Sequence, residues 1–70
     1  MSESHRVTVN FAPQTYQALE GIAKMRGTTN VEALRQSIGL THYLERERIE
    51  GARILIERDG KLTELQWLNP

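Results

Sequence analysis

The sequence has no cysteine, no excess of either charge and no long apolar run, and each absence narrows the possible functions. Without cysteine the chain forms neither a disulfide nor a thiolate metal site. Nine Lys and Arg residues balance nine Asp and Glu residues, so the formal net charge is +0. That neutrality argues against sequence-blind nucleic-acid binding, which needs a large positive field. It permits a specific DNA binder with a small local site.

The absence of a long apolar run indicates the cellular location that we expect for the protein. No run approaches the roughly 18 residues of a membrane span, and residues 1–4 do not resemble the start of a signal peptide. We therefore expect a cytoplasmic protein with no membrane partner. With 70 residues, 39% of them apolar, we expect one small globular domain. Because so small a domain buries little surface, it is a candidate for stabilisation by self-association.

Residues that could carry catalysis or hold a cofactor are also scarce. The two histidines, His5 and His42, have no metal-ligand spacing and no Ser, Cys or acid arranged as a nucleophile and base. Glu45 and Glu47 are two residues apart, on opposite sides of a helix. The five glycines do not form a phosphate loop. We expect no enzyme, no cofactor and no metal site.

A short strand is predicted near the N-terminus, after a polar tail over residues 1–5. Residues 6–11 read Arg-Val-Thr-Val-Asn-Phe, which alternates polar and apolar side chains with a period of two. The polar and apolar side chains therefore lie on opposite faces. These faces are Arg6, Thr8 and Asn10 on one side and Val7, Val9 and Phe11 on the other.

Two amphipathic helices are expected to follow. Pro13 suits the first turn of a helix that runs to about Arg26, with Gly27 as its stop. The second helix is expected to run to about residue 50.

Local signals mark both ends of that second helix. Thr29 and Glu32 have the spacing of a capping box, and Gly51 is placed to end the helix. Near its end Glu45 and Arg48, three residues apart, are expected to pair with each other or across an interface.

Residues 51–70 are expected to form a hairpin. Asp59-Gly60 between two strand-like runs is typical of a type I′ turn. One face of this hairpin is apolar and must pack on something, either as a structural extension of the core or as a docking surface. The facing pairs on that side are Ile54 with Leu65, Ile56 with Thr63, and Ala52 with Trp67.

The first strand needs a partner, because a lone strand cannot satisfy its own backbone hydrogen bonds. Pairing with the hairpin would give a three-stranded α+β monomer. Pairing antiparallel with a second copy would give a two-stranded ribbon in a symmetric dimer. Such a ribbon fits the major groove, and Arg, Asn and Thr suit the edges of guanine, adenine and thymine.

The chain from residue 6 to about residue 44 resembles the ribbon-helix-helix DNA-binding proteins of the Arc, MetJ and CopG type. The resemblance rests on the alternating strand, the Gly27 turn with its hydroxyl cap, and a Glu–Leu–Arg–Ser–Ile progression from Glu32 to Ile38. It implies a mainly α fold with a short N-terminal strand, in an intertwined homodimer with an intermolecular antiparallel ribbon. The DNA-binding domain would span residues 6–50, and the C-terminal β-hairpin lies outside the family core.

The resemblance also implies roles for particular residues. Arg6, Thr8 and Asn10 become base readers, and the start of the second helix becomes a phosphate clamp. The clamp has an independent physical reason, because free N–H groups and the helix dipole favour an anion there. The implied clamp is Thr28, Thr29 and Asn30, and the implied dimer core is Val7, Val9, Phe11, Leu34 and Ile38.

Three functions remain open at this point. The first is a sequence-specific transcriptional repressor or autoregulator that binds double-stranded DNA, with several dimers on adjacent sites. The second is an antitoxin, or a plasmid or conjugation accessory protein, whose hairpin binds a partner protein. The third is a monomeric α+β adaptor that does not bind DNA.

Overall fold

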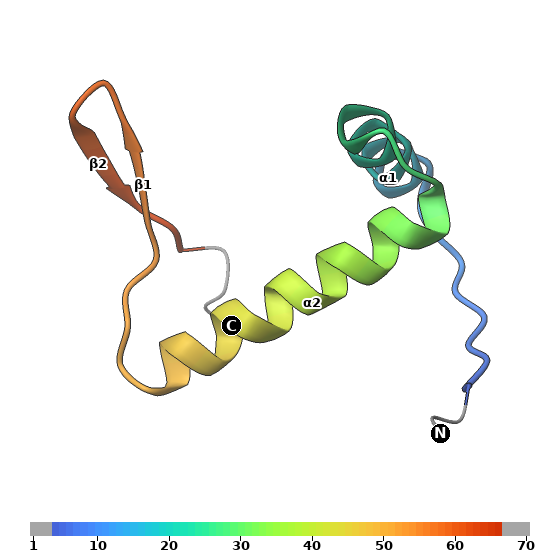
Figure 1. Cartoon of the computed structure of the whole chain (residues 1–70), viewed down its shortest axis with the longest axis horizontal. Coiled ribbons are helices and arrows are strands. Elements are labelled where there is room, and N and C mark those ends of the chain that lie inside the picture. The colour runs from blue at the N-terminus through green and yellow to red at the C-terminus, as the bar shows by residue number, and fades with distance from the viewer. Residues whose placement is uncertain (1–3, 67–70) are drawn as a thin grey trace. The chain divides into compact units, whose positions relative to one another are not determined.

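The computed structural model describes residues 4–66, which are mainly helical and end in a hairpin (Figure 1). The chain divides into two compact units, Met1–Leu34 and Arg35–Pro70. The elements in chain order are α1 (Pro13–Arg26), α2 (Asn30–Ile49), β1 (Leu55–Arg58) and β2 (Lys61–Glu64).

Helix α1 has the boundaries that the sequence predicts. Pro13 occupies the first turn, where its missing N–H costs nothing. At the other end Gly27 adopts a left-handed conformation, with φ 64° and ψ 38°. Its N–H donates to the Lys24 carbonyl at 3.2 Å, and the Thr28 N–H donates to the Ala23 carbonyl at 2.9 Å. This pair of bonds is a Schellman motif, which satisfies the last carbonyls of the helix.

Helix α2 begins and ends where the predicted caps lie, and its last residue is Ile49 rather than residue 50. At its start the Glu32 N–H donates to Thr29 Oγ1 at 3.1 Å, which is the capping-box bond. At its end Gly51 has φ 98°, and the Ala52 N–H donates to the Glu47 carbonyl at 2.9 Å. The same Schellman geometry therefore ends both helices.

The hairpin also forms as predicted. Asp59 and Gly60 have φ of 52° and 79°, which are the two positive values that a type I′ turn requires. Strands β1 and β2 are antiparallel, with Ile56 opposite Thr63, and the Leu65 N–H donates to the Ile54 carbonyl at 2.7 Å. The expectation for Trp67 lies outside the described residues.

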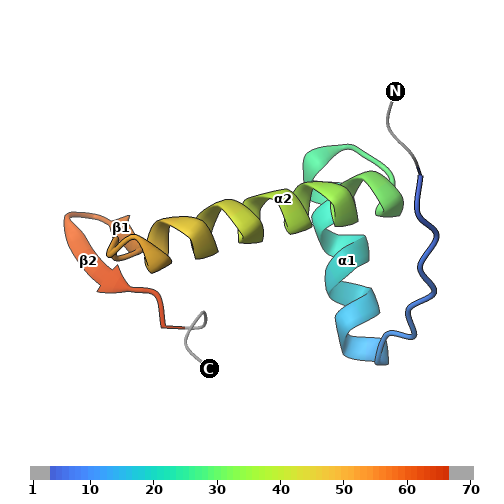
Figure 2. The same ribbon diagram turned by 90° about the horizontal axis from the view of Figure 1, so that it is seen from below.

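The unit Met1–Leu34 has a small core where α1 meets the first turn of α2 (Figure 2). Its buried residues are Leu19, Ala23 and Ala33. Partly buried apolar side chains pack against them, and these are Phe11, Ile22 and Leu34. Two of the side chains expected in a dimer core, Phe11 and Leu34, are thus partly buried against the core of the single chain.

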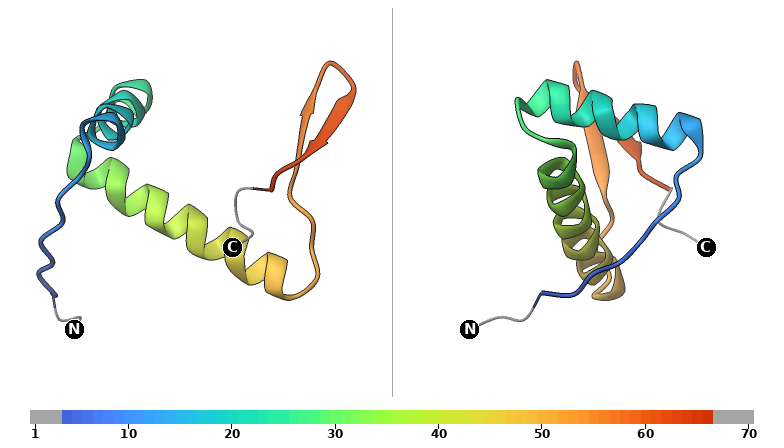
Figure 3. Two further views of the ribbon diagram at one scale, coloured as in Figure 1. Left: turned by 180° about the vertical axis from the view of Figure 1, so that it is seen from behind. Right: turned by 90° about the vertical axis from the view of Figure 1, so that its right-hand side faces the viewer.

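The strand predicted over residues 6–11 is not formed in the single chain. Residues 4–12 have no regular secondary structure (Figure 3), and the sheet among the described residues consists of β1 and β2 alone. The three-stranded sheet of the monomeric alternative is therefore not formed. The physical reason is general, because an extended segment becomes a strand only when another strand takes up its backbone hydrogen bonds.

Candidate nucleic-acid interface

The segment of residues 4–12 carries the three predicted base readers on an open backbone. Arg6, Thr8 and Asn10 are all exposed. The alternating apolar residues are exposed as well, Val7 by 76% and Val9 by 55%. Two valines this open, two residues apart on an unpaired backbone, indicate a surface that the single chain leaves uncovered.

The C-terminal end of this segment is anchored to the folded unit by Phe11. This side chain is half-buried and packs on the core of Leu19, Ala23 and Ala33. Its ring also lies beside that of Tyr16, with the centroids 6.5 Å apart and the planes tilted by 46°, within the range of favourable aromatic pairs. The anchor fixes the point where the segment leaves α1.

The turn between the helices presents the first backbone N–H groups of α2. Thr29 accepts two hydrogen bonds from the backbone of α2. Its Oγ1 accepts one from the Glu32 N–H, and its carbonyl accepts one from the Ala33 N–H at 2.9 Å. The N–H groups of Asn30 and Val31 have no acceptor within the helix, as at any helix start. The Thr29 hydroxyl keeps its own proton for donation. The predicted Thr28–Asn30 clamp thus brings together N–H groups, a hydroxyl and the positive end of the helix dipole.

Tyr16 is a further member of this site that the sequence pattern did not single out. Asn30 Nδ2 donates to the Tyr16 hydroxyl at 3.3 Å, which joins α1 to the first residue of α2. The helical pattern placed Tyr16 only on the apolar side of α1. The residue type could have indicated this contact, because the hydroxyl of a tyrosine at the edge of an apolar face usually forms a hydrogen bond.

The Tyr16 contact changes the expected role of Asn30. One amide proton of Asn30 is directed at the tyrosine oxygen, so the side chain is partly used inside the protein. The tyrosine hydroxyl accepts this bond and retains its own proton. Tyr16 is 44% exposed, so that proton is available to an external acceptor.

The unit Met1–Leu34 has as many acids as bases, three of each, but two of its bases lie close to the turn between the helices. Lys24 and Arg26 occupy the last turn of α1, where a cation suits the negative end of the helix dipole. Both are exposed and directly precede the turn at Gly27. They add positive charge beside the clamp in the sequence, whereas the chain as a whole is neutral.

Helix α2 continues beyond this unit with apolar side chains in the open. Ile38, predicted for the dimer core, is 62% exposed, and Leu40 and Tyr43 are 58% and 61% exposed. The predicted pair of Glu45 and Arg48 is formed within the helix, with Arg48 Nε 2.8 Å from Glu45 Oε1. That hydrogen bond and the carboxylate charge raise the pKa of Arg48 above its ordinary value.

Among residues 4–66, no three His, Asp or Glu side chains are grouped as metal ligands. Neither helix in this part of the chain is both long and apolar enough to cross a membrane. Comparison with protein-family models, with curated proteins and with solved structures found no match, so no relative assigns a role to any of these residues.

Proposed function

We propose that the protein is a homodimeric, sequence-specific DNA-binding protein that acts as a transcriptional repressor or autoregulator. One observation carries the proposal. The segment of residues 4–12 is anchored at Phe11, has an unpaired backbone and exposes Val7 and Val9. Antiparallel pairing with the same segment of a second copy satisfies that backbone, and the valine face of the resulting ribbon then lies over the helices of the two chains.

The small core of the single chain supports the proposed dimer. Only Leu19, Ala23 and Ala33 are buried among the described residues, which is far less than a domain of this length needs to fold alone. Exposed Ile38 on α2 offers further apolar surface. A two-fold pairing is self-complementary, because each chain supplies the same strand and the same helix face.

In this dimer the ribbon presents Arg6, Thr8 and Asn10 of both chains on its outer face. The guanidinium suits guanine O6 and N7, the amide suits adenine N6 and N7, and the threonine suits a base edge or a thymine methyl. Symmetry favours an inverted-repeat site. Sequence is read by the ribbon, and position is fixed by the flanking phosphates.

The phosphate contact is proposed at the start of α2. Its donors are the N–H groups of Asn30 and Val31 and the hydroxyls of Thr28 and Thr29. The bond between Asn30 and Tyr16 adds the Tyr16 hydroxyl to this set. Contacts of this kind hold any DNA sequence and weaken with salt.

Two measurements test the proposal directly. Sedimentation at micromolar concentration should give twice the chain mass of 8.0 kDa. Selection from random duplexes followed by footprinting should yield one inverted-repeat sequence. A monomer, or a selected pool without any shared sequence, would contradict the proposal.

A second candidate function is an antitoxin or a plasmid or conjugation accessory protein. The observation in its favour is the hairpin, whose strand residues are all exposed. Deleting residues 53–70 separates this function from a purely structural role of the hairpin. If the dimer and its DNA binding survive, the hairpin is free for a partner, and if the dimer dissociates, the hairpin is part of its core.

A further inference from the structure

The two faces of the hairpin carry charges of opposite sign. The pairing of Ile56 with Thr63 and of Arg58 with Lys61 puts these four side chains on one face, named here the basic face. The pairing of Leu55 with Glu64 and of Glu57 with Leu62 defines the other, named the acidic face. The basic face therefore combines two cations with one apolar and one polar neighbour, and the acidic face combines two carboxylates with two leucines.

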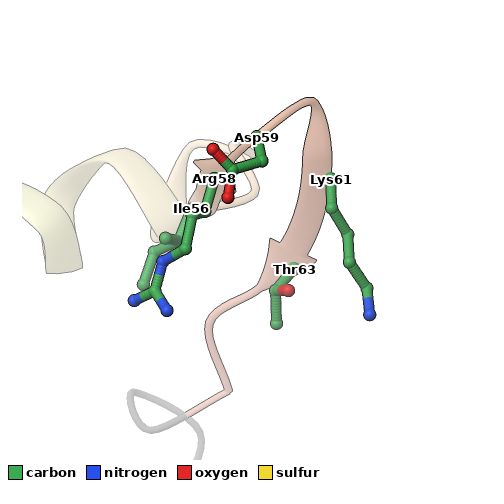
Figure 4. A pocket seen from close by; sticks show the side chains of 5 residues that line it. All are labelled: Ile56, Arg58, Asp59, Lys61 and Thr63. Carbon is green, nitrogen blue, oxygen red and sulfur yellow. The ribbon is translucent and has the colours of Figure 1, made fainter.

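The basic face holds two cations directly opposite each other. Arg58 and Lys61 form a cross-strand pair at the turn, and like charges in that position are destabilising. Neither forms an ion pair with an acid in the described part of the chain. Figure 4 shows both side chains with Ile56 and Thr63 around an open hollow of about 580 Å³, with Asp59 at the turn. With Asp59 counted, the residues around this hollow still carry one more positive than negative charge.

The acidic face is the complement of this arrangement. Leu55 and Leu62 are 42% and 60% exposed, and Glu57 and Glu64 lie beside them. Glu64 is weakly paired, with its Oε1 3.7 Å from Arg53 Nε. Glu57 forms no ion pair with another described residue. One negative charge therefore remains uncompensated on this face.

Both faces are open in the single chain. Every residue of β1 and β2 is exposed, and a two-stranded hairpin without a cover is marginally stable in water. We propose that the basic face of one hairpin packs on the acidic face of the hairpin of a second copy. Stacked in the same orientation, Arg58 of one copy lies over Glu57 of the next, and Ile56 lies over Leu55 of the next.

The charges also dictate which kind of assembly this contact builds. A symmetric contact of basic face on basic face would bring the cations Arg58 and Lys61 of two copies together. The favourable contact joins unlike faces, so it is heterologous and leaves a free face at each end. It therefore links dimers to one another, and, resting on the proposed function, it would make binding at adjacent DNA sites cooperative.

Cysteine cross-linking tests which faces meet, since the chain has no cysteine of its own. Thr63→Cys marks the basic face and Leu62→Cys marks the acidic face. When the two variants are mixed and oxidised, mass spectrometry should find the mixed disulfide several-fold above either homodimeric disulfide. Gln17→Cys, at an exposed position of α1, measures random collision. A mixed yield no higher than with this control, or a dominant Thr63→Cys homodimer, would overturn the inference.

Charge reversal gives a second and independent test. The double variant R58E/K61E has two acidic faces, and E57K/E64K has two basic faces, so neither should assemble beyond the dimer. Mixing them should restore assembly in sedimentation at low salt, and the charge-conserving R58K/K61R should assemble as the unaltered protein does. If the unaltered protein is a dimer that never grows with concentration, this inference fails and the proposed function stands. A monomer at every concentration would instead contradict the proposed dimer.

Discussion

Thr29 has a structural role as a helix cap, and we propose a second role for the same side chain in binding DNA. Its hydroxyl accepts the Glu32 N–H at 3.1 Å, so it caps α2 whatever else it does. The same hydroxyl belongs to the proposed phosphate contact. The two roles are separable, because the cap acts on the folded protein alone and the contact acts only on the complex with DNA.

Replacing Thr29 by alanine should therefore have two effects. Loss of the cap should lower the free energy of unfolding by about 1 kcal/mol, measured by urea denaturation. Affinity for the selected duplex and for random DNA should fall by the same factor, because a phosphate contact does not distinguish sequences. Thr29→Ser keeps the hydroxyl and serves as the control. Unchanged affinity for both duplexes in the alanine variant would remove Thr29 from the interface.

Asn10 should show the opposite pattern. It is exposed in the single chain, so Asn10→Ala should leave the free energy of unfolding nearly unchanged. Binding to the selected duplex should weaken by about 1–3 kcal/mol, with relaxed preference at one base pair. Titration with the selected duplex and with random DNA measures both the affinity and the sequence preference. An equal loss on the two duplexes would mean that Asn10 does not read a base.

At the scale of elements, the sequence predicts what is decided locally. The ends of a helix leave backbone N–H and C=O groups without partners, and a residue within a few positions can satisfy them or make them unnecessary. The residues that do so here are Pro13, Gly27, Thr29 and Gly51. Asp59-Gly60 likewise fixes the hairpin register through its turn. These signals suffice for both helices and the hairpin, with one residue of difference at the end of α2.

Two features depend on residues far apart, and local patterns do not determine them. The bond between Tyr16 and Asn30 joins positions 14 apart, and no sequence spacing specifies it. The strand predicted over residues 6–11 needs a partner strand, and in the single chain this segment has no regular structure. For the candidate site, the sequence therefore predicts the cap and the exposed polar residues but not the contact of Tyr16, and the paired ribbon that it also predicts stays a prediction.

Two glycines allow the same substitution to be compared in opposite settings. Gly60 has φ 79° in the turn, where a side chain costs roughly 1–2 kcal/mol. Gly21 lies inside α1, and a Cβ there would meet nothing within 4 Å, so Gly21→Ala should stabilise by about 0.5–1 kcal/mol. Amide hydrogen exchange should therefore be faster in residues 55–64 of Gly60→Ala and slower in α1 of Gly21→Ala. Equal protection of the hairpin in both variants would contradict the type I′ turn.

At the scale of the whole molecule, the proposed dimer rests on how much apolar surface the single chain leaves open. Val9 is 55% exposed, so in a monomer an aspartate there would change stability by no more than about 0.5 kcal/mol. In the proposed dimer the same side chain is covered, because the valine face of the ribbon lies over the helices. The effect of a substitution at Val9 therefore measures the stability of the dimer rather than that of the single chain.

Val9→Asp should accordingly abolish the dimer. Two-fold symmetry buries the new carboxylate twice, and a buried unpaired charge costs several kcal/mol even after its pKa has risen. Sedimentation at micromolar concentration should then give the mass of one chain, with loss of DNA binding. Thr8→Asp is the matched control, because it adds the same charge one residue away on the outer face of the ribbon. That variant should remain a dimer and lose DNA binding alone, through repulsion of the phosphates. If both variants keep the dimer, the dimer does not bury the valine face of residues 6–11.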